Sequence, residues 1–377
     1  MEFEKAQELG KLMSDIFDSR HPVAGKGAHN WAFRAEPHSE IIKRKVKRFE
    51  NLPRRENPIL LCTTGPSAIA NREGLDKILQ EFSNGNDSTA KKLREAFGDQ
   101  GGAMTPDSVA ELGHDMMKEE LWLNYGKEKY LTHIPAMWED HKEDIERLIE
   151  SLKEQNLSPA DLSGMFHVES SWLMERIADQ CIEKRLNLAY MISSVGNAKP
   201  MLERAKRAGY RLVALSVEQS LEATKTKNEE NWQKGREEYV NGRSEFGRVA
   251  APVEVIERTY PSSDEISICR ENVMKLAPGL FDTLIEVTGD NVSSVKTFPT
   301  PGAGSTKPLP GKYRPASPTR PIDSDKRPTP VQPNQVHSSQ FASIRQASFR
   351  PGESNAPETS PSSPPPTPAS RQRSNTR

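Results

Sequence analysis

The sequence predicts an α/β fold in which helices flank a mainly parallel sheet. The clearest evidence is residues 166–228, where a helix, a strand, a helix, a strand and a helix follow one another. Leu173, Ile177 and Cys181 recur every four residues and give the first helix an apolar stripe. Residues 186–192 form a nearly continuous apolar run, which is typical of a strand buried on both faces.

The other elements are predicted in the same way, from helical spacing of apolar residues and from short apolar runs. Further strands are expected at residues 58–64, 211–217 and 282–288, the last of which would close the sheet. Between the first strand and residue 166 the pattern is mostly helical, so residues 84–160 are predicted to form a helical insertion beside the sheet. Helices are expected at residues 2–17, 39–50, 73–82, 108–123, 199–208, 252–259 and 267–276.

The chain divides into three predicted parts: an N-terminal helical segment (1–57), the α/β domain (58–296) and a disordered tail (297–377). The tail holds 17 of the 29 prolines and carries 11 Lys and Arg against 4 Asp and Glu. Because the whole chain has a formal net charge of −1, a basic tail follows an acidic body. The tail offers too few apolar side chains to form a core, which is why disorder is predicted.

The tail is also a candidate docking segment for a protein partner. Ser317 and Ser348 each follow an arginine by three residues, a spacing that suits basophilic kinases, and SSPPPTP (362–368) is a short polyproline stretch. Such patterns are common in Pro/Ser/Arg-rich sequence, and a passive solvated tail is the alternative. A basic unfolded end is also typical of secretion signals, which raises the hypothesis of an effector translocated into a host cell.

Composition favours a soluble protein of the cytoplasm. The cysteines at positions 62, 181 and 269 lack the spacing of a disulfide framework or a zinc site, so we expect buried free thiols and no metal. The start is charged and amphipathic, unlike a signal peptide, and no apolar run reaches the ~20 residues of a membrane span. The basic run at residues 42–48 predicts a solvated helix face; nucleic-acid binding is disfavoured because aromatic residues do not interleave it.

Residues 58–82 predict a strand, a loop and a helix, the context of a phosphate-binding loop. With this start, the order of the later elements resembles the zeta-toxin family of P-loop phosphotransferases over about residues 58–290. The resemblance implies a P-loop NTPase-like fold, ATP and Mg²⁺ as cofactors, and a small-molecule acceptor such as a nucleotide or a UDP-activated amino sugar. The matching segments are HVESSW (167–172), NLAYMISS (187–194), GYRLVALSV (209–217), GRVAAP (247–252) and FDTLIEV (281–287).

The resemblance assigns roles to individual residues. It implies that Lys227, Arg243 and Arg248 form a cationic lid that stabilises the transferring phosphoryl group. His167, Glu169 and Ser193 are the implied acceptor-binding residues. The implied nucleotide-binding residues are Gly65, Pro66, Ser67, Asn71 and Arg72.

This chain departs from the family at two of these places. The Gly-Lys-Ser/Thr end of a working phosphate loop is missing from TTGPSAIANRE (63–73), which leaves Arg72 as the cation in reach. Met191 and Ile192 stand where the family carries an acidic contact to the sugar, and only the Ser193 hydroxyl is kept. The loop is therefore either an altered phosphate loop or a tight turn that binds nothing.

The general base is left open, because four aspartates lie in the interval where the family has one: Asp99, Asp107, Asp115 and Asp161. The functional hypotheses are an ATP-dependent phosphotransferase, a toxin or a secreted effector in some settings, and a catalytically inactive kinase-fold protein that acts as a binding or regulatory module. His167 as a structural histidine and the lid as a solvated charged loop are the corresponding alternatives for the site.

Overall fold

The computed structural model describes the α/β body and the N-terminal helices of the chain. Residues 67, 71 and 72 of the predicted phosphate loop, most of residues 84–104 and 132–155, and the tail from residue 299 lie outside the described residues. No described helix is long and apolar enough to cross a membrane. The described residues are 2–17, 35–66, 75–76, 79–80, 91, 97, 105–131, 143, 146–147, 150, 152, 154, 156–193, 195–261, 265–289 and 291–298.

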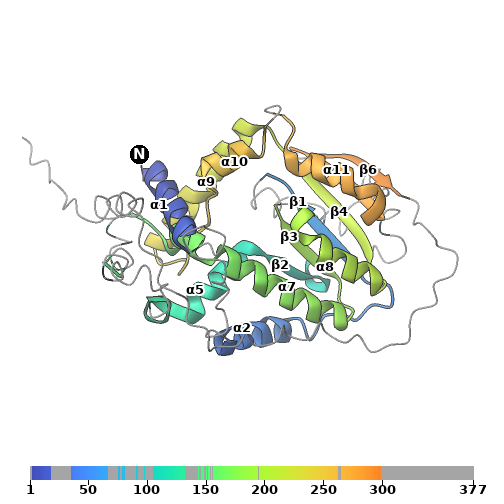
Figure 1. The fold of residues 1–377 in the computed structure, drawn as a ribbon, viewed down its shortest axis with the longest axis horizontal. Helices are drawn as coiled ribbons and strands as arrows, with labels where there is room; N and C mark the ends of the chain where they lie inside the picture. The colour runs from blue at the N-terminus through green and yellow to red at the C-terminus, as the bar shows by residue number, and fades with distance from the viewer. Residues whose placement is uncertain are drawn as a thin grey trace, which may run out of the picture.

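A six-stranded sheet in the order β2-β3-β1-β4-β5-β6 forms the centre of the fold (Figure 1). The first five strands in this order are parallel, and β6 pairs with β5 in the antiparallel sense. This confirms the predicted α/β class and is consistent with a P-loop NTPase-like fold. The strands are β1 (Ile59–Thr64), β2 (Ala110–Gly113), β3 (Leu188–Ile192), β4 (Arg211–Glu218), β5 (Thr283–Thr288) and β6 (Asn291–Thr297).

The central strand β1 is buried along its whole length, as its apolar sequence predicts. Leu60 pairs with Leu188 of β3 on one side and with Leu212 of β4 on the other. Cys62 lies in this strand as a free thiol, and burial raises its pKa to about 12. A thiol in this state stays protonated and unreactive at neutral pH, as expected for a structural cysteine.

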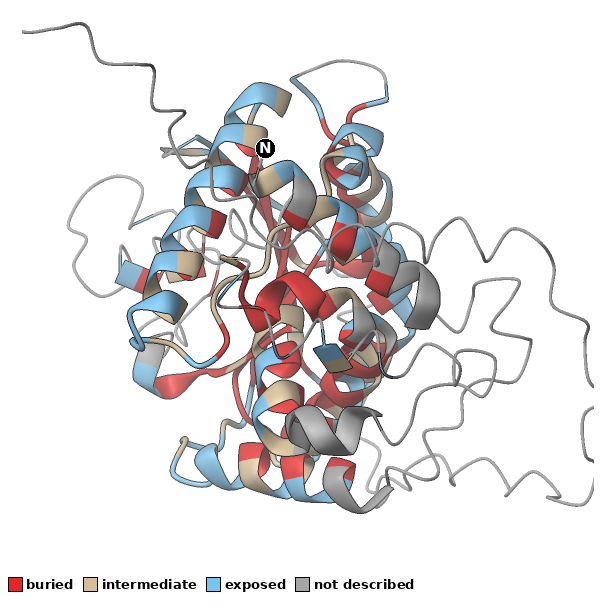
Figure 2. Cartoon of the chain, turned by 90° about the vertical axis from the view of Figure 1, so that its left-hand side faces the viewer, coloured by how far each residue is buried: buried red, intermediate tan, exposed pale blue. Residues whose placement is uncertain are grey.

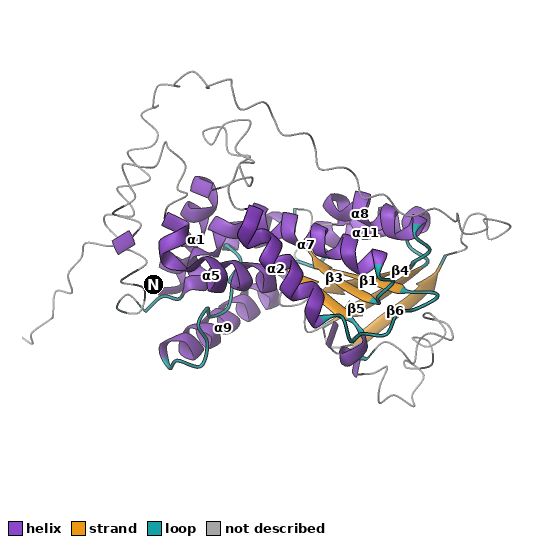
Figure 3. Cartoon of the chain, turned by 90° about the horizontal axis from the view of Figure 1, so that it is seen from below, coloured by secondary structure: helices purple, strands orange, loops and turns teal. Residues whose placement is uncertain are grey.

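Helices cover both faces of the sheet. Leu60 and Cys62 belong to the core shared with α7, α8 and α11, whereas Ile59 and Leu61 pack with residues 75, 79 and 97 on the opposite face. Figure 3 shows α8 and α11 on the same side of the sheet, and Figure 2 shows the buried residues gathered between the layers. The helices that cover the sheet on the first face are α7 (His167–Glu183), α8 (Val195–Arg207) and α11 (Ile268–Leu280).

The N-terminal segment contributes two helices to the body. Helix α1 (Glu2–Phe17) places Leu9 and Met13 in the main core and packs on the short 3₁₀ helix η5 (Pro159–Phe166). Helix α2 (Ala35–Arg48) packs on α7 and on α5 (His114–Leu131). Both helices were predicted, with α2 four residues further towards the N-terminus at its start.

The basic run of α2 is only partly the solvated face that its charge predicts. Arg44, Lys45 and Arg48 converge on the carboxylate of Glu120 in α5, at 2.6, 2.8 and 3.0 Å. Lys45 is itself buried, and the hydrogen bonds from Lys45 and Arg44 outweigh burial and lower the pKa of Glu120. The cluster therefore holds α2 against α5 and uses up much of the positive charge that a nucleic-acid surface would need.

Two strands differ from the sequence predictions. We expected a helix from residue 108, but residues 110–113 form β2, the edge strand beside β3, and α5 begins only at His114. Part of the predicted helical insertion therefore belongs to the sheet. We also expected the strand now seen as β5 to be the last, but Gly289 turns the chain with a positive φ of 55° into β6. Strands of four residues, or with the mixed sequence NVSSVKT, carry little periodic signal.

The segment after Asn228 is not the loop that its glycines and charges suggested. Helix α9 (Leu221–Val240) runs through it and buries a face built from Thr224, Asn228, Trp232 and Gly235. The indole Nε1 of Trp232 donates to Asp161 at 2.7 Å, and the Asn228 amide makes two 2.9 Å bonds with the backbone of Ala251. Polar residues at four-residue spacing look solvated in the sequence, but here they find their hydrogen-bond partners on other elements in a buried interface.

One arginine ties together three segments at the edge where the parallel strands begin. Arg185 follows α7 in the left-handed conformation, with φ 56°. Its guanidinium donates to the carbonyl oxygens of Arg55 and Ala208, both at 3.1 Å, and to that of Glu56. These three carbonyls flank β1 and β4, so Arg185 fixes where both strands start.

Replacing Arg185 tests this role. We expect Arg185→Ala to lower the free energy of unfolding by about 2–3 kcal/mol, because three carbonyls lose their donors and alanine keeps the strained φ. Arg185→Gly should cost less, since glycine adopts positive φ freely. Arg207→Ala, at an exposed position in the last turn of α8, is the matched control. Urea denaturation measures all three, and equal stability of the Arg185→Ala and Arg207→Ala chains would contradict the assignment.

Candidate functional site

We call the edge of the sheet where its parallel strands end the carboxyl edge, and the sheet topology predicts where on this edge a ligand crevice lies. After β1 the chain passes to the face packed by residues 75 and 79, whereas after β3 it passes to α8 on the opposite face. Loops that leave neighbouring strands in opposite directions open a crevice between them, and ligands of open α/β sheets bind there. The crevice therefore lies beside the end of β1.

The start of the predicted phosphate loop lies at this crevice. Gly65 and Pro66 follow β1 directly and are buried. The Thr64 hydroxyl donates to the carbonyl oxygen of Ser193 at 3.2 Å, which joins the ends of β1 and β3. The predicted nucleotide ligands Ser67, Asn71 and Arg72 fall outside the described residues, so their roles stay predictions.

A polar cavity of about 880 Å³ opens on the other side of β1, at the ends of β4 and β5. Its walls include Gln219, Lys227 and Glu230 from the start of α9, with Arg270 of α11 and Thr288 of β5. The Gln219 side-chain oxygen is buried and accepts no hydrogen bond within the described part of the chain. The cavity walls therefore carry charges of both signs, which suits a polar ligand.

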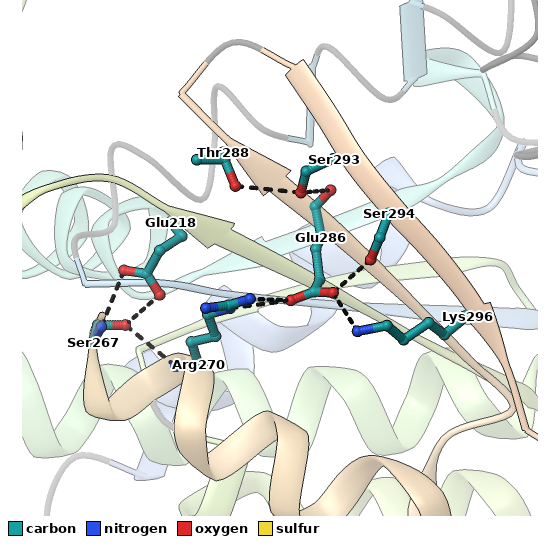
Figure 4. Close-up of polar contacts among 8 residues, drawn as sticks. All are labelled: Glu218, Ser267, Arg270, Glu286, Thr288, Ser293, Ser294 and Lys296. Atoms are coloured by element: carbon teal, nitrogen blue, oxygen red, sulfur yellow. Dashed lines mark hydrogen bonds and ion pairs between the residues drawn. The ribbon is translucent and has the colours of Figure 1, made fainter. Parts of the chain in front are cut away.

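Glu218, the last residue of β4, lines the cavity. It is buried and accepts hydrogen bonds from the backbone N–H and the hydroxyl of Ser267, at 3.2 and 2.9 Å (Figure 4). Ser267 in turn caps α11 by accepting from the backbone N–H of Arg270. Burial raises the pKa of Glu218 although the two bonds from Ser267 oppose the rise. The carboxylate thus fixes the start of α11 beside the cavity.

Arg270 connects the cavity wall to a second buried carboxylate. Its guanidinium donates to Glu286 of β5 at 3.0 and 2.9 Å, and Glu286 also binds Lys296 at 2.7 Å and Ser294, both on β6 (Figure 4). Burial alone would raise the pKa of Glu286, but the hydrogen bonds from Lys296, Ser294 and Arg270 lower it to about 2. Glu286 therefore joins α11, β5 and β6 and orients Arg270.

The predicted lid cations lie on α9 and just beyond it. Lys227 lines the cavity, and Arg243 is exposed beyond the end of α9. Arg248 binds Glu238 through two nitrogens, at 3.0 and 2.9 Å, and Asn231 at 3.1 Å. Both Arg248 and Arg243 help to lower the pKa of Glu238. Arg248 is therefore held on α9, and its role as a cation that closes over a ligand stays a prediction. The packing is close, because a Cβ on Gly235 would lie 2.4 Å from the Arg248 backbone nitrogen.

The predicted acceptor-binding residues lie near the carboxyl edge but in different surroundings. Ser193 is exposed at the end of β3. Glu169 is buried and hydrogen-bonds His38 of α2, so it helps to hold α2 on α7. His167 is exposed and stacks on His114, with ring centroids 5.5 Å apart. The acceptor-binding roles of all three stay predictions.

The structure separates the aspartates that the sequence left equivalent. Asp115 directly follows β2 at the carboxyl edge and lies 3.6 Å from Lys118. Asp107 precedes β2 and is exposed at the opposite edge. Asp161 is buried in η5, where burial raises its pKa against the hydrogen bonds from Ser158 and Trp232. Asp99 lies outside the described residues. Asp115 is thus the described candidate for a general base.

Sequence reasoning missed Glu218, Arg270, Glu286 and His114. Each follows or faces the end of a strand, and the rule that ligands bind at the carboxyl ends could have selected Glu218 once β4 was predicted. Arg270 and Glu286 are sixteen residues apart and meet only through the tertiary fold. His114 could not be selected, because β2 itself was predicted as a helix.

Comparisons with known proteins add little to this geometry. No family model matches the chain, and no curated protein matches it. One solved structure with detectable similarity comes from the PezAT chromosomal toxin–antitoxin system of Streptococcus pneumoniae. It shares 12% identity and a TM-score of 0.39, over 69% of this chain and 80% of that one. At this level the similarity carries no argument about function. Among the described residues no group of three or more His, Cys, Asp or Glu side chains could hold a metal ion.

The Glu286 cluster makes stability depend on acid pH. The folded-state pKa of about 2 is lower than the ordinary value of 4.5, so the stabilisation is present above pH 4.5 and is lost as the pH falls towards 2. We expect Glu286→Gln to lower the free energy of unfolding by about 2–3 kcal/mol at pH 7, because Arg270 and Lys296 lose their charged partner.

At pH 2 the same variant and the original chain should differ little, since the pH is then close to the folded-state pKa and most of the stabilisation is lost. Glu271→Gln is the control, because Glu271 pairs only across 3.7 Å with the exposed Lys275. Chemical denaturation at the two pH values gives the difference. A deficit of the Glu286→Gln chain that is as large at pH 2 as at pH 7 would contradict the account.

Proposed function

We propose that this protein is an ATP-dependent phosphotransferase that acts on a small-molecule acceptor. The observation that carries the proposal is the linear order of groups along the carboxyl edge. Asp115 follows β2, Ser193 follows β3, Gly65 follows β1, and the polar cavity lies at β4 and β5. An acceptor, a phosphoryl group and a nucleoside can lie along this edge in the same order.

The distances along the edge suit the reaction. Neighbouring strands lie about 4.8 Å apart, so the ends of β1 and β2 are on the order of 10 Å apart, which is the space of a phosphoryl group and its acceptor. In the reaction, the acceptor oxygen forms a bond to the γ-phosphorus and the bond to the ADP oxygen breaks. The acceptor hydroxyl proton passes to Asp115. Lys227, the described lid cation that lines the cavity, is the candidate to bind negative charge on the nucleotide.

The described residues fit ATP better than they fit Mg²⁺. The cavity, with Lys227, Glu230 and Arg270 in its walls, fits the charged and polar groups of a nucleotide. Gly65 and Pro66 fit the entry of a phosphate loop. The described residues offer no cluster for Mg²⁺, and we derive no step from the ion. Magnesium in phosphoryl transfer is bound largely by the phosphates themselves, so it belongs to the proposal as part of the nucleotide complex.

A second candidate is an inactive kinase-fold protein that binds a partner or a nucleotide without turnover. The pairing of Arg248 with Glu238 and Asn231 favours it, because the cation is held by protein carboxylate and amide groups. The loss of the acidic contact at Met191 and Ile192 points the same way. A toxin or a translocated effector, and a docking role for the tail from residue 299, remain hypotheses at this stage.

Thermal denaturation with millimolar ATP and Mg²⁺ tests nucleotide binding. Binding to the folded state alone stabilises it by RT ln(1 + [L]/Kd), about 2–3 kcal/mol at ~100 Kd, so we expect a higher melting temperature. Release of ADP in the presence of a panel of nucleotide sugars then distinguishes the phosphotransferase from the inactive module. A melting temperature unchanged by ATP would exclude both nucleotide-dependent versions of the proposal.

Asp115→Asn tests the catalytic assignment. We expect turnover to fall at least about 100-fold, the usual contribution of a positioned general base, while the ATP-induced shift in melting temperature is kept. Asp107→Asn, which changes an exposed aspartate at the opposite edge of the same strand, should leave both unchanged. If the two variants retain equal activity, Asp115 is not the base.

A further inference from the structure

Positive charge gathers at the edge of the sheet where β1, β3 and β4 begin, which we call the amino edge. The three segments that lead into these strands are residues 54–58, 184–187 and 206–211. They hold seven basic side chains against one carboxylate, Glu56, with Glu183 beside them at the end of α7. These seven, the amino-edge cations, are Arg54, Arg55, Lys184, Arg185, Lys206, Arg207 and Arg211.

Backbone contacts bring the three segments together. The N–H of Arg55 donates to the carbonyl oxygen of Arg185 at 2.9 Å, and the N–H of Arg211 donates to that of Pro58 at 2.9 Å. The Arg185 guanidinium adds bonds to the carbonyl oxygens of Arg55 and Ala208, both at 3.1 Å. The amino-edge cations, which are far apart in the sequence, therefore share one edge of the fold.

Most of this charge has no carboxylate partner. Elsewhere in the body arginines bind carboxylates: Arg204, on the previous turn of α8, binds Glu175 and Asp179 at 2.7 and 3.0 Å. Within the described residues, no ion pair is made by five of the amino-edge cations: Arg54, Arg55, Lys184, Arg207 and Arg211. Like charges held together without counter-charges repel one another, so a bound anion stabilises this edge.

The C-terminal tail is attached at the same edge. The backbone N–H of Phe298 donates to the carbonyl oxygen of Asp282, which directly precedes β5. The Asp282 carboxylate itself accepts the backbone N–H of Leu212 at 2.8 Å. Because β6 runs antiparallel to β5, its last residue lies at the amino edge, and the tail follows from there. Residues 299–377 carry 11 Lys and Arg against 4 Asp and Glu, so further positive charge is tethered beside the amino-edge cations.

The kinds of side chain at this edge point to phosphate groups as the ligand. Five of the seven amino-edge cations are arginines, whose planar guanidinium binds phosphate through two parallel hydrogen bonds. Among the described residues, none of the exposed large apolar side chains belongs to the three segments. A protein interface would need buried apolar or aromatic anchors, and a nucleic-acid single strand would need aromatic side chains on which its bases stack.

We propose that the amino edge binds the phosphate backbone of a nucleic-acid duplex without reading its base sequence, and that the cations of the tail add to this contact. The surface lies at the opposite edge of the sheet from the polar cavity and does not depend on the proposed phosphotransferase function. It is also separate from the basic run of α2, where three cations are paired with Glu120. Binding is driven by the release of counterions from the duplex.

Fluorescence anisotropy of the full chain with a labelled DNA duplex of about 20 base pairs tests the proposal. We expect a Kd on the order of 10 μM at 0.15 M salt, and an affinity that falls steeply and log-linearly with salt concentration. A DNA duplex of scrambled sequence and an RNA duplex should bind within about threefold, since the phosphates are common to all three. No binding at 50 mM salt, or a strong preference for one sequence, overturns the proposal.

Paired variants locate the surface. Arg54→Gln with Arg207→Gln removes two exposed amino-edge cations, and we expect at least about tenfold weaker binding and a salt slope smaller by about 2. Lys234→Gln with Arg258→Gln is the matched control, because it removes the same charge from exposed positions on α9 and α10. The control should bind within about twofold of the original chain. Without DNA, neither pair should lower the melting temperature.

Two further results would overturn the assignment. Equal affinity and equal salt slope of the two paired variants would place the contact elsewhere, for example on the tail alone. A single strand bound more tightly than the duplex, or vesicles with anionic lipid bound as tightly as the duplex, would assign the amino edge to a different partner.

Discussion

The position of β1 between two parallel partners is the constraint on which the rest of the structure depends. Every residue of Ile59–Thr64 is buried, and each of its two faces packs on a different core. Backbone hydrogen bonds to β3 and β4 leave this strand no freedom of register, because a slip of one residue would exchange its two faces. The end of β1 is thereby fixed at the crevice, together with Gly65 and the ends of β3 and β4.

Buried charges hold the elements around this edge. Glu120 of α5 gathers three cations of α2, Glu169 hydrogen-bonds His38, and Glu286 joins Arg270 to β6. A buried ion pair adds little net stability over an apolar core, but breaking one is costly, so such pairs specify one arrangement. Arg270 illustrates this: its contacts with Glu286 on the inside fix its position on the cavity wall.

The sequence predicts the central strands of this fold well and its edge strands poorly. Long apolar runs such as residues 186–192 and 211–217 mark central strands because they must be buried on both faces. Residues 110–113 and 291–297 form the two edges of the sheet. The first strand is only four residues long, and residues 292–297 of the second include no buried side chain, so neither shows a clear pattern. In α9 the polar residues Thr224 and Asn228 are buried because they hydrogen-bond Tyr260 and the backbone of Ala251, a tertiary effect that no local pattern reports. For the site, the resemblance named candidate residues, but their places along the sheet, such as that of Asp115 at the carboxyl edge, follow only from the fold.

Hydrogen–deuterium exchange with and without ATP and Mg²⁺ tests the central claim, that ligands bind at the carboxyl edge, most directly. We expect slower exchange at the end of β1, in residues 218–227 at the start of α9 and in residues 265–270 at the start of α11. Amides at the opposite edge, around Arg185 and Tyr210, should be unaffected apart from the uniform effect of global stabilisation. Protection confined to the opposite edge, or none at the three carboxyl-edge segments while ATP is bound, would contradict the account.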